Sequence, residues 1–191
     1  MDERTRRILD TAVHLAESGG FAAVRLRDVA RTSGVALGTV YKRFRSKEDL
    51  VVGVLAIKVD EVRRRVAEAP SVGPTPLVRV VGFFAFLTDF LCDCPNFGRA
   101  VVRSASSGEP AMSQRLAQFN AAMFELGLGA MLGEPRAPRQ AEVNMFIALQ
   151  HVWFAAMCSW AGEVCSAAAV VGQVESAARL MIGAVDGSPG G

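Results

Sequence analysis

The segment from Leu37 to Leu50 constrains the fold of this chain more than any other stretch. It reads Leu-Gly-Thr-Val-Tyr-Lys-Arg-Phe, followed by Arg-Ser-Lys-Glu-Asp-Leu. Val40 and Phe44 are four residues apart, so they can share the buried face of a short helix. Ser46, with an acidic residue three positions later, is typical of a helix N-terminal cap. The segment predicts a short helix, a tight break and the start of a longer helix.

The other side of this short helix is expected to carry polar side chains. Thr39 and Tyr41 offer hydroxyls, and Lys42 and Arg43 offer cations. Such groups on an exposed short helix suit contacts with the phosphates and base edges of DNA. We therefore interpret it as a DNA-recognition helix. The predicted DNA contacts, which include neighbouring cations able to reach phosphates, are Arg25, Arg27, Leu37, Gly38, Thr39, Tyr41, Lys42, Arg43 and Lys47.

The residues upstream supply partners for the recognition helix. Residues 5–18 carry apolar side chains at helical spacing, and Gly19-Gly20 predicts the end of that helix. A second short helix is expected over residues 26–32, and Ser33-Gly34-Val35 forms the turn before Leu37. Two short helices joined by a turn of three or four residues containing Gly are the pattern of a helix-turn-helix.

Residues 4–50 resemble the N-terminal domain of the TetR family of bacterial transcriptional repressors. The resemblance rests on Ile8-Leu9, Ala12, Gly20-Phe21, Arg27-Asp28-Val29-Ala30, Gly34-Val35, Gly38-Thr39-Val40-Tyr41, Phe44 and Ser46-Lys47-Glu48-Asp49-Leu50. It implies a homodimer that binds a palindromic DNA operator and responds to a ligand. One position departs from the pattern: Ala36 stands where the family often has a polar residue, and alanine cannot cap the recognition helix.

Charge is unevenly distributed along the chain. The net charge is +2, but residues 1–65 hold 14 Lys and Arg against 9 Asp and Glu, and the remainder holds 7 against 10. A basic head on a mildly acidic body fits a nucleic-acid-binding end, although uneven surface solubility would give the same asymmetry. Because the N-terminus has no signal-peptide pattern, a cytoplasmic protein is expected.

The four cysteines predict no cofactor or metal centre. They are Cys92, Cys94, Cys158 and Cys165. A metal or redox pair at Cys92-Asp93-Cys94 is the alternative, but its spacing differs from Cys-x-x-Cys and no second paired unit follows. Free thiols that pack as small apolar side chains are the simpler interpretation.

The rest of the chain predicts an all-α body. The expected helices cover residues 49–69, 76–91, 96–104, 110–132, 138–162 and 167–182. Residues 143–162 lack charges and approach the length of a membrane span, but Asn144, Gln150 and His151 interrupt them, which favours a buried helix and no membrane partner. The predicted organisation is a helix-turn-helix domain over 1–48, a ligand-binding and dimerisation bundle over 49–185, joined by the long helix, and a disordered tail over 186–191.

Large apolar side chains in the body exceed what so small a bundle needs, which favours an apolar cavity between helices. Any one of them could instead be ordinary core. The predicted ligand contacts are Phe83, Phe86, Phe90, Phe119, Met123, His151 and Trp153. Arg79, Arg99, Arg103 and Arg115 are candidates to meet an acidic ligand group, or are surface residues.

The last two helices carry apolar stripes that predict a dimer interface. The resemblance to the TetR family also implies that these two helices pair with their copies in a four-helix contact. The predicted interface residues are Val143, Ile147, Phe154, Met157, Val174 and Met181. Thr75-Pro76, the run from Val152-Trp153 to Ser159-Trp160 and residues 179–183 add a looser similarity to actinobacterial TetR-family repressors of sterol and lipid catabolism. That similarity implies a small, largely apolar effector, sterol-derived or an acyl-CoA.

Two other classes of function remain open from the sequence. The first is an enzyme, or a small-molecule binding protein, that uses the apolar pocket, with His151 as a base. No Ser nucleophile elbow, Gly-rich phosphate loop or His-Glu-x-x-His run accompanies that histidine. The second is an architectural protein that carries a helix-turn-helix. The sequence favours a ligand-responsive, homodimeric repressor over both.

Overall fold

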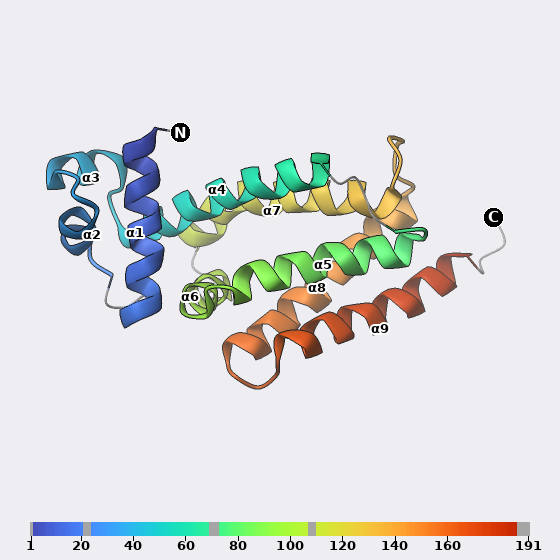
Figure 1. Ribbon diagram of the computed structural model, residues 1–191. Coiled ribbons are helices and arrows are strands. Elements are labelled where there is room, and N and C mark those ends of the chain that lie inside the picture. Colours follow the sequence, from blue (N-terminus) through green and yellow to red (C-terminus); the bar gives the residue numbers. More distant parts are fainter. Residues whose placement is uncertain (1, 21–23, 69–72, 107–109, 187–191) are drawn as a thin grey trace.

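The chain is described here from a computed structural model, which covers residues 2–20, 24–68, 73–106 and 110–186. Every regular element in these ranges is an α-helix, which confirms the predicted all-α class. Figure 1 shows a small head of helices at one end of an elongated helical body.

The head consists of α1 (Glu3–Gly19), α2 (Leu26–Ser33), α3 (Leu37–Arg43) and the start of α4 (Lys47–Glu68). Ile8, Val29 and Val40 are each fully buried and bring the first three helices together. Gly34 ends α2 with a φ of 67°. That left-handed conformation strains residues with a Cβ, so glycine permits the tight turn into α3.

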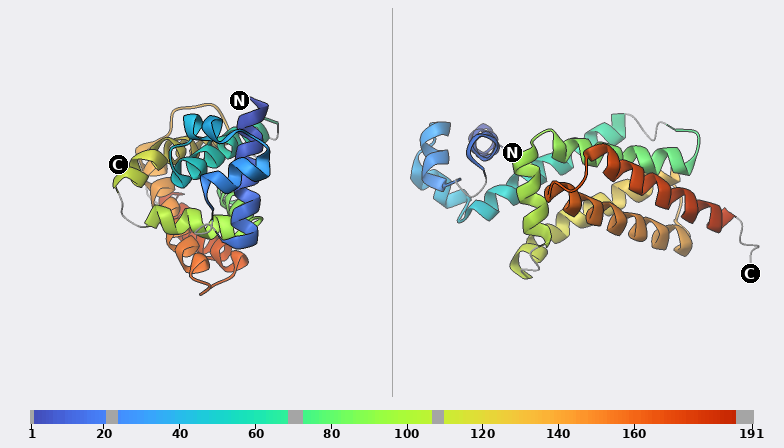
Figure 2. Two further views of the ribbon diagram at one scale, coloured as in Figure 1. Left: turned by 90° about the vertical axis from the view of Figure 1, so that its left-hand side faces the viewer. Right: turned by 90° about the horizontal axis from the view of Figure 1, so that it is seen from below.

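The body contains the rest of α4 and five further helices. These are α5 (Pro76–Cys92), α6 (Pro95–Ser106), α7 (Pro110–Leu132), α8 (Gln140–Ala161) and α9 (Ala167–Asp186). α4 packs along α7, α5 packs on α7 and α9, and α8 and α9 form an antiparallel hairpin. The shorter α6 lies at the head end of the body, in contact with α1 and α8 (Figures 1 and 2).

The predicted helices differ from the observed ones mainly at their ends. α8 begins at Gln140 rather than at residue 138, and α9 continues to Asp186, four residues beyond the expected end. α4 runs without a break through positions 48 and 49, so the predicted domain boundary lies in its first turn. Of the predicted tail, Asp186 ends α9, and residues 187–191 lie outside the described residues.

Core packing connects the head to the body. One cluster of buried apolar residues includes Ile8 and Phe44 of the head together with Phe97 and Trp160 of the body. A second cluster fills the far part of the body around Phe84 and the other aromatic side chains. Because the first cluster crosses the junction, a shift of helices in the body can be transmitted to the head.

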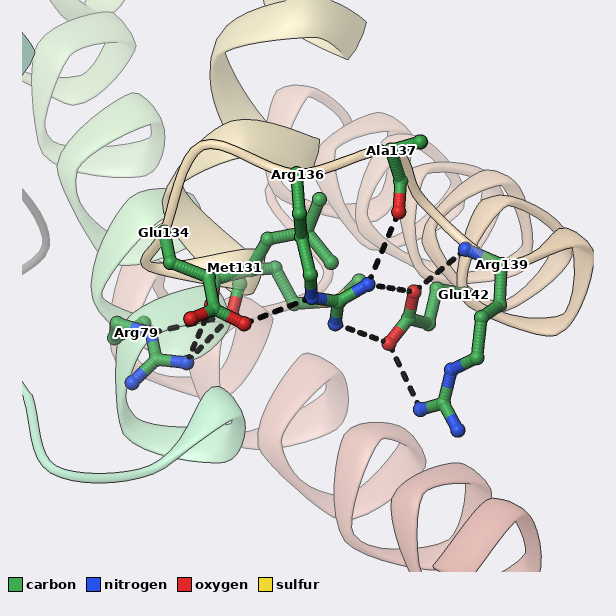
Figure 3. Close-up of polar contacts among 8 residues, drawn as sticks. Arg79, Met131, Glu134, Arg136, Ala137, Arg139 and Glu142 are labelled. Carbon is green, nitrogen blue, oxygen red and sulfur yellow. Dashed lines mark hydrogen bonds and ion pairs between the residues drawn. The ribbon is translucent and has the colours of Figure 1, made fainter.

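Two arginine networks hold the far end of the body together (Figure 3). The Arg79 guanidinium donates hydrogen bonds to the carbonyls of Met131 and Leu132, with N–O distances of 2.9–3.1 Å, and so caps the last turn of α7. Arg136 pairs with both carboxylate oxygens of the buried Glu142, at 3.0 and 2.7 Å. Arg139 adds a second cation at 2.8 Å from Glu142.

None of the described helices combines the length and the apolar composition that a membrane span requires.

Candidate DNA-binding and effector-binding sites

The recognition helix α3 is held by its apolar side and leaves its polar side open. Val40 is fully buried and Phe44 is 7 % exposed, as the spacing of four predicted. On the opposite side Tyr41 is 51 % exposed and Leu37 43 % exposed, Lys42 is exposed and Thr39 is half-buried. The structure therefore presents a hydroxyl, a phenol and a cation together at the outer end of the head.

The N-terminus of α3 has no side-chain cap. Ala36 occupies the N-cap position, and no side chain hydrogen-bonds to the first amides of the helix within the described residues. The amides of Thr39 and Val40 bond to the Ala36 carbonyl instead. The amides of Leu37 and Gly38 therefore lie before the first backbone hydrogen bond of α3, and both residues are exposed.

Arg43 is placed differently from its neighbour Lys42. Its guanidinium lies 2.5 Å from the carboxylate of Asp2, the N-cap of α1, and it also hydrogen-bonds to the hydroxyl of Thr5. The hydrogen bonds from Thr5 to Asp2, followed by those from Arg43 and its positive charge, lower the pKa of Asp2 to about 2. Arg43 thus fastens the end of α3 to the start of α1.

The other predicted DNA contacts lie at the edges of the head. Arg25 is the exposed N-cap of α2, and Arg27 is exposed in its first turn. Lys47, at the start of α4, is half-buried and lines a groove between the head and the body together with Arg99 and Arg103. Tyr41 and Lys42 are not part of the lining of this groove.

An apolar cavity lies in the middle of the body. Four of the predicted ligand contacts line it: Phe83, Phe119, Met123 and Trp153. Phe86 and Phe90 are half-buried outside its lining. His151 is exposed to solvent on the outer side of α8, so its predicted place in the cavity is wrong. A shift of one residue along a helix rotates the side chain by about 100°, which brings Gln150 to the cavity instead.

Sequence reasoning missed several residues of this cavity. Besides Gln150, the lining includes Phe84, Leu87, Asn120 and Phe146. The two amides are the polar groups that a periodicity argument could have found, since each lies one turn from a predicted contact: Asn120 is three residues before Met123, and Gln150 is three before Trp153.

The cavity is nearly closed by its own aromatic rings. Its volume is about 20 Å³, close to what one water molecule needs. Phe84 and Phe146 stack with their ring centroids 5.6 Å apart, and Trp153 lies 5.9 Å from Phe84. Drug-sized ligands occupy roughly 300–1,000 Å³. A ligand of that size must therefore turn these rings aside.

A buried hydroxyl fixes the orientation of Trp153. The indole Nε1–H donates to the Thr88 hydroxyl at 3.0 Å, and that hydroxyl donates in turn to the Phe84 carbonyl at 2.7 Å. Thr88 has no exposed surface. The wall residue Trp153 is thus held in place by a satisfied hydrogen bond to a fully buried hydroxyl.

The predicted interface residues of α8 and α9 fall into two groups, exposed or half-buried residues and fully buried ones. Ile147 is 39 % exposed, and Val143, Phe154 and Met181 are half-buried. Met157 and Val174 have no exposed surface, so they belong to the protomer's core and their assignment to the contact surface is wrong. Leu180, which is 78 % exposed on α9, was not predicted.

The remaining candidates have other roles. Arg79 is engaged with backbone carbonyls, whereas Arg99 and Arg103 line the groove beside Lys47. Arg115 has a side chain outside the described residues. Burial and the nearby acids Asp89 and Asp93 raise the pKa of the Cys92 thiol to about 11, so it is protonated and unreactive at neutral pH.

Comparison with known proteins identifies the family. The profile of the bacterial regulatory proteins of the tetR family matches residues 8–54. The HTH-type transcriptional repressor KstR of Rhodococcus jostii RHA1 is 30% identical over 186 residues, which cover 97% of this chain and 85% of KstR. The chain belongs to the TetR family. It is a transcriptional repressor of that family, and not an enzyme.

Solved structures agree with this assignment. A TetR transcriptional regulator from Rhodococcus sp. RHA1 superimposes with a TM-score of 0.78 and 25% identity, and the match covers 94% of each chain. Thermus thermophilus FadR, a TetR-family repressor solved in complex with lauroyl-CoA, has a TM-score of 0.68 over 98% of this chain and all of FadR. At 19% identity, the match with FadR shows only that the two proteins share a fold.

Proposed function

We propose that this repressor binds a palindromic operator as a homodimer and releases it when an apolar effector enters the body. The proposed operator binding rests on the exposed face of α3. Thr39, Tyr41 and Lys42 lie together there, on a helix anchored by the buried Val40. Hydroxyls and cations at this position in a helix-turn-helix contact base edges and phosphates in the major groove.

Two observations support the dimer, one on the hairpin α8–α9 and one on the recognition helix α3. Its outer face exposes Ile147 and Leu180, together with small residues such as Ala155 and Gly172, which allow helices to approach closely. One recognition helix of seven residues covers few base pairs, and a two-fold dimer reads two half-sites about 34 Å apart or a multiple of that distance. In the dimer, Val143, Phe154 and Met181 would lie at the edge of this contact.

The chemistry of the cavity wall suits a lipid-like or sterol-like effector. The cavity wall consists of phenylalanine, tryptophan, methionine and leucine side chains together with the amides of Asn120 and Gln150, and the wall residue Trp153 is hydrogen-bonded to Thr88 behind it. Thermus thermophilus FadR, which shares this fold, was solved in complex with lauroyl-CoA, a molecule with an apolar chain of this kind. A molecule of this kind would open the cavity by turning the stacked rings of Phe84 and Phe146.

A hydrogen-bonded link can carry this opening to the head. The Glu17 carboxylate, near the end of α1, accepts a hydrogen bond of 2.6 Å from the amide of Phe97 at the start of α6. The Asn96 side chain donates at 2.8 Å to the Glu17 carbonyl. Because α6 packs on α8 beside Trp160, displacement of α8 would move α6, then α1, and change the spacing of the two heads.

The test of the DNA-binding surface compares Tyr41→Ala with the wild-type protein on a selected duplex, by fluorescence anisotropy. Tyr41 is half-exposed, so its removal should lower operator affinity by about tenfold or more while leaving the melting temperature nearly unchanged. Equal affinity of the two proteins for the duplex would show that Tyr41 does not contact the DNA.

A further inference from the structure

A groove between the head and the body differs from the apolar cavity in its chemistry. It has a volume of about 420 Å³ and is lined by Gly20, Lys47, Asn96, Arg99, Ala100, Arg103, Ser104 and Glu163. Gly20 and Lys47 belong to the head, and the others belong to α6 and to the turn after α8. Three cations and one carboxylate thus line the groove, with Lys47 on the side of the head.

Arg99 is the most unusual of these groups. Its guanidinium lies over the Trp160 ring, 5.5 Å from the centroid, and 3.5 Å from the Glu163 carboxylate. Its Nε atom is buried and has no hydrogen-bond partner among the described residues. A buried, unsatisfied donor on a cation is costly unless an acceptor reaches it.

The neighbouring residues hold the groove in shape. Arg103, one turn further along α6, donates at 3.1 Å to the carbonyl of Ala161 at the end of α8. Glu163 has a φ of 62°, which is uncommon for a residue with a side chain. The turn that carries Glu163 therefore accepts backbone strain while its carboxylate lies beside Arg99.

We propose that this groove binds a phosphate-type anion, with Arg99 and Arg103 as the main ligands. Guanidinium groups match the tetrahedral oxygens of phosphate with paired hydrogen bonds, and the stacked Arg99 is pre-ordered for that role. An anion here would compete with Glu163 and would bridge head and body, since Lys47 faces it from the head. The source is either free inorganic phosphate or an organic phosphate ester.

The same helix carries both sites. Trp153 lines the apolar cavity and Trp160 supports Arg99, and these two residues are about 10 Å apart along α8. A molecule with an apolar chain and a phosphorylated head group would therefore find both chemistries within its reach. The anion site itself does not depend on the identity of the apolar effector.

Titration calorimetry on the full chain without DNA tests the site, with phosphate, pyrophosphate and coenzyme A as probes at constant ionic strength. Saturable binding is expected for pyrophosphate or coenzyme A. Arg99→Gln/Arg103→Gln should weaken it by about tenfold or more, and Glu163→Gln should tighten it a few-fold because the competing carboxylate is lost. Stronger binding of coenzyme A than of pyrophosphate would identify the source as an organic phosphate ester.

Two further variants keep the result interpretable. Ala100→Glu adds a carboxylate to the groove without removing an arginine, so it should weaken binding even if the double variant folds poorly. Arg179→Gln is the matched control, because Arg179 pairs with Glu175 on α9 and does not line the groove. The proposal is overturned if no probe binds saturably, or if Arg179→Gln weakens binding as much as the double variant does. Since no DNA is present, this failure is separate from a failure of operator binding.

Discussion

Arg43, the last residue of the recognition helix, is paired with Asp2, the N-cap of the first helix, with 2.5 Å between guanidinium nitrogen and carboxylate oxygen. Lys42, next to it, is exposed. Neighbouring cations of one helix therefore have different surroundings, although the sequence alone presents them as equivalent. Arg43 positions α3 against α1, whereas Lys42 extends the surface that DNA would meet.

Lys42→Ala and Arg43→Ala should accordingly differ in DNA binding and in stability. Removal of Lys42 should weaken binding to all duplexes about equally and reduce the slope of log affinity against log salt by roughly one, because one phosphate contact is lost. Arg43→Ala should instead lower the melting temperature, with a smaller change in slope. Anisotropy titrations at several salt concentrations and thermal unfolding measure both. Identical behaviour of the two variants would contradict the distinction.

Glu142 should make the stability of the body depend on pH in the acidic range. Its hydrogen bonds with Arg136, aided by Arg139, lower the pKa to about 2 from the ordinary 4.5. A carboxylate with a lowered folded-state pKa stabilises the protein fully above about pH 4.5, and that contribution is lost as the pH falls through 2.

Glu142→Gln should therefore lower the free energy of unfolding by about 2 kcal/mol at pH 7. The difference from wild type should shrink between pH 4.5 and pH 2. Denaturant unfolding at a series of pH values measures this difference, in which the effects of the other carboxylates largely cancel. A constant difference over that range would show that ionisation of Glu142 does not contribute to the stability.

Much of this arrangement could be predicted from the sequence, and the failures have physical reasons. The helices, the turn at Gly34 and the burial of Val40 and Phe44 follow from local spacing. The placement of His151 and Met157 does not, because it depends on how helices rotate against each other. The pairing of Arg43 with Asp2 was also beyond sequence reasoning, since it joins residues that local patterns cannot relate.

Gly127 of α7 should control the size of the apolar cavity. A Cβ added there would lie 2.2 Å from a ring carbon of Phe146 and 2.5 Å from one of Phe83. Gly127→Ala should push these rings into the cavity, destabilise the protein by about 1–3 kcal/mol, and raise the effector concentration needed to release DNA.

Gly129→Ala is the matched control on the same helix, since nothing lies within 4 Å of its added Cβ. It should stabilise α7 by about 0.5–1 kcal/mol and leave the effector response unchanged. Thermal unfolding and effector titration of the protein–DNA complex compare the two variants. An equal effector response would place the effector elsewhere.

Glu17 should be needed for communication between body and head more than for DNA binding itself. Glu17→Ala removes the carboxylate that caps α6 at Phe97, so operator affinity without effector should change little while release by effector becomes weaker. Asp10→Ala, at an exposed position of the same helix, is the control. If Glu17→Ala responds to effector as strongly as Asp10→Ala, the link through α6 is wrong.

Ile147→Glu should disrupt the proposed dimer. The side chain is 39 % exposed on α8, and a charge buried in an apolar contact is strongly unfavourable. Val78→Glu, at a similarly exposed position on α5, is the control. Sedimentation velocity should show a shift toward the monomer for the first variant only. A wild-type protein that sediments as a monomer at micromolar concentration would contradict the proposed assembly.

Selection of duplexes from a random pool by the purified protein, followed by sequencing, tests the central claim most directly. The claim predicts enrichment of an inverted repeat whose half-sites are separated by one helical turn or a multiple of it, and loss of that enrichment with Tyr41→Ala. A pool that shows no enriched sequence at low salt would contradict the assignment of α3 as a sequence-reading helix of a dimeric repressor.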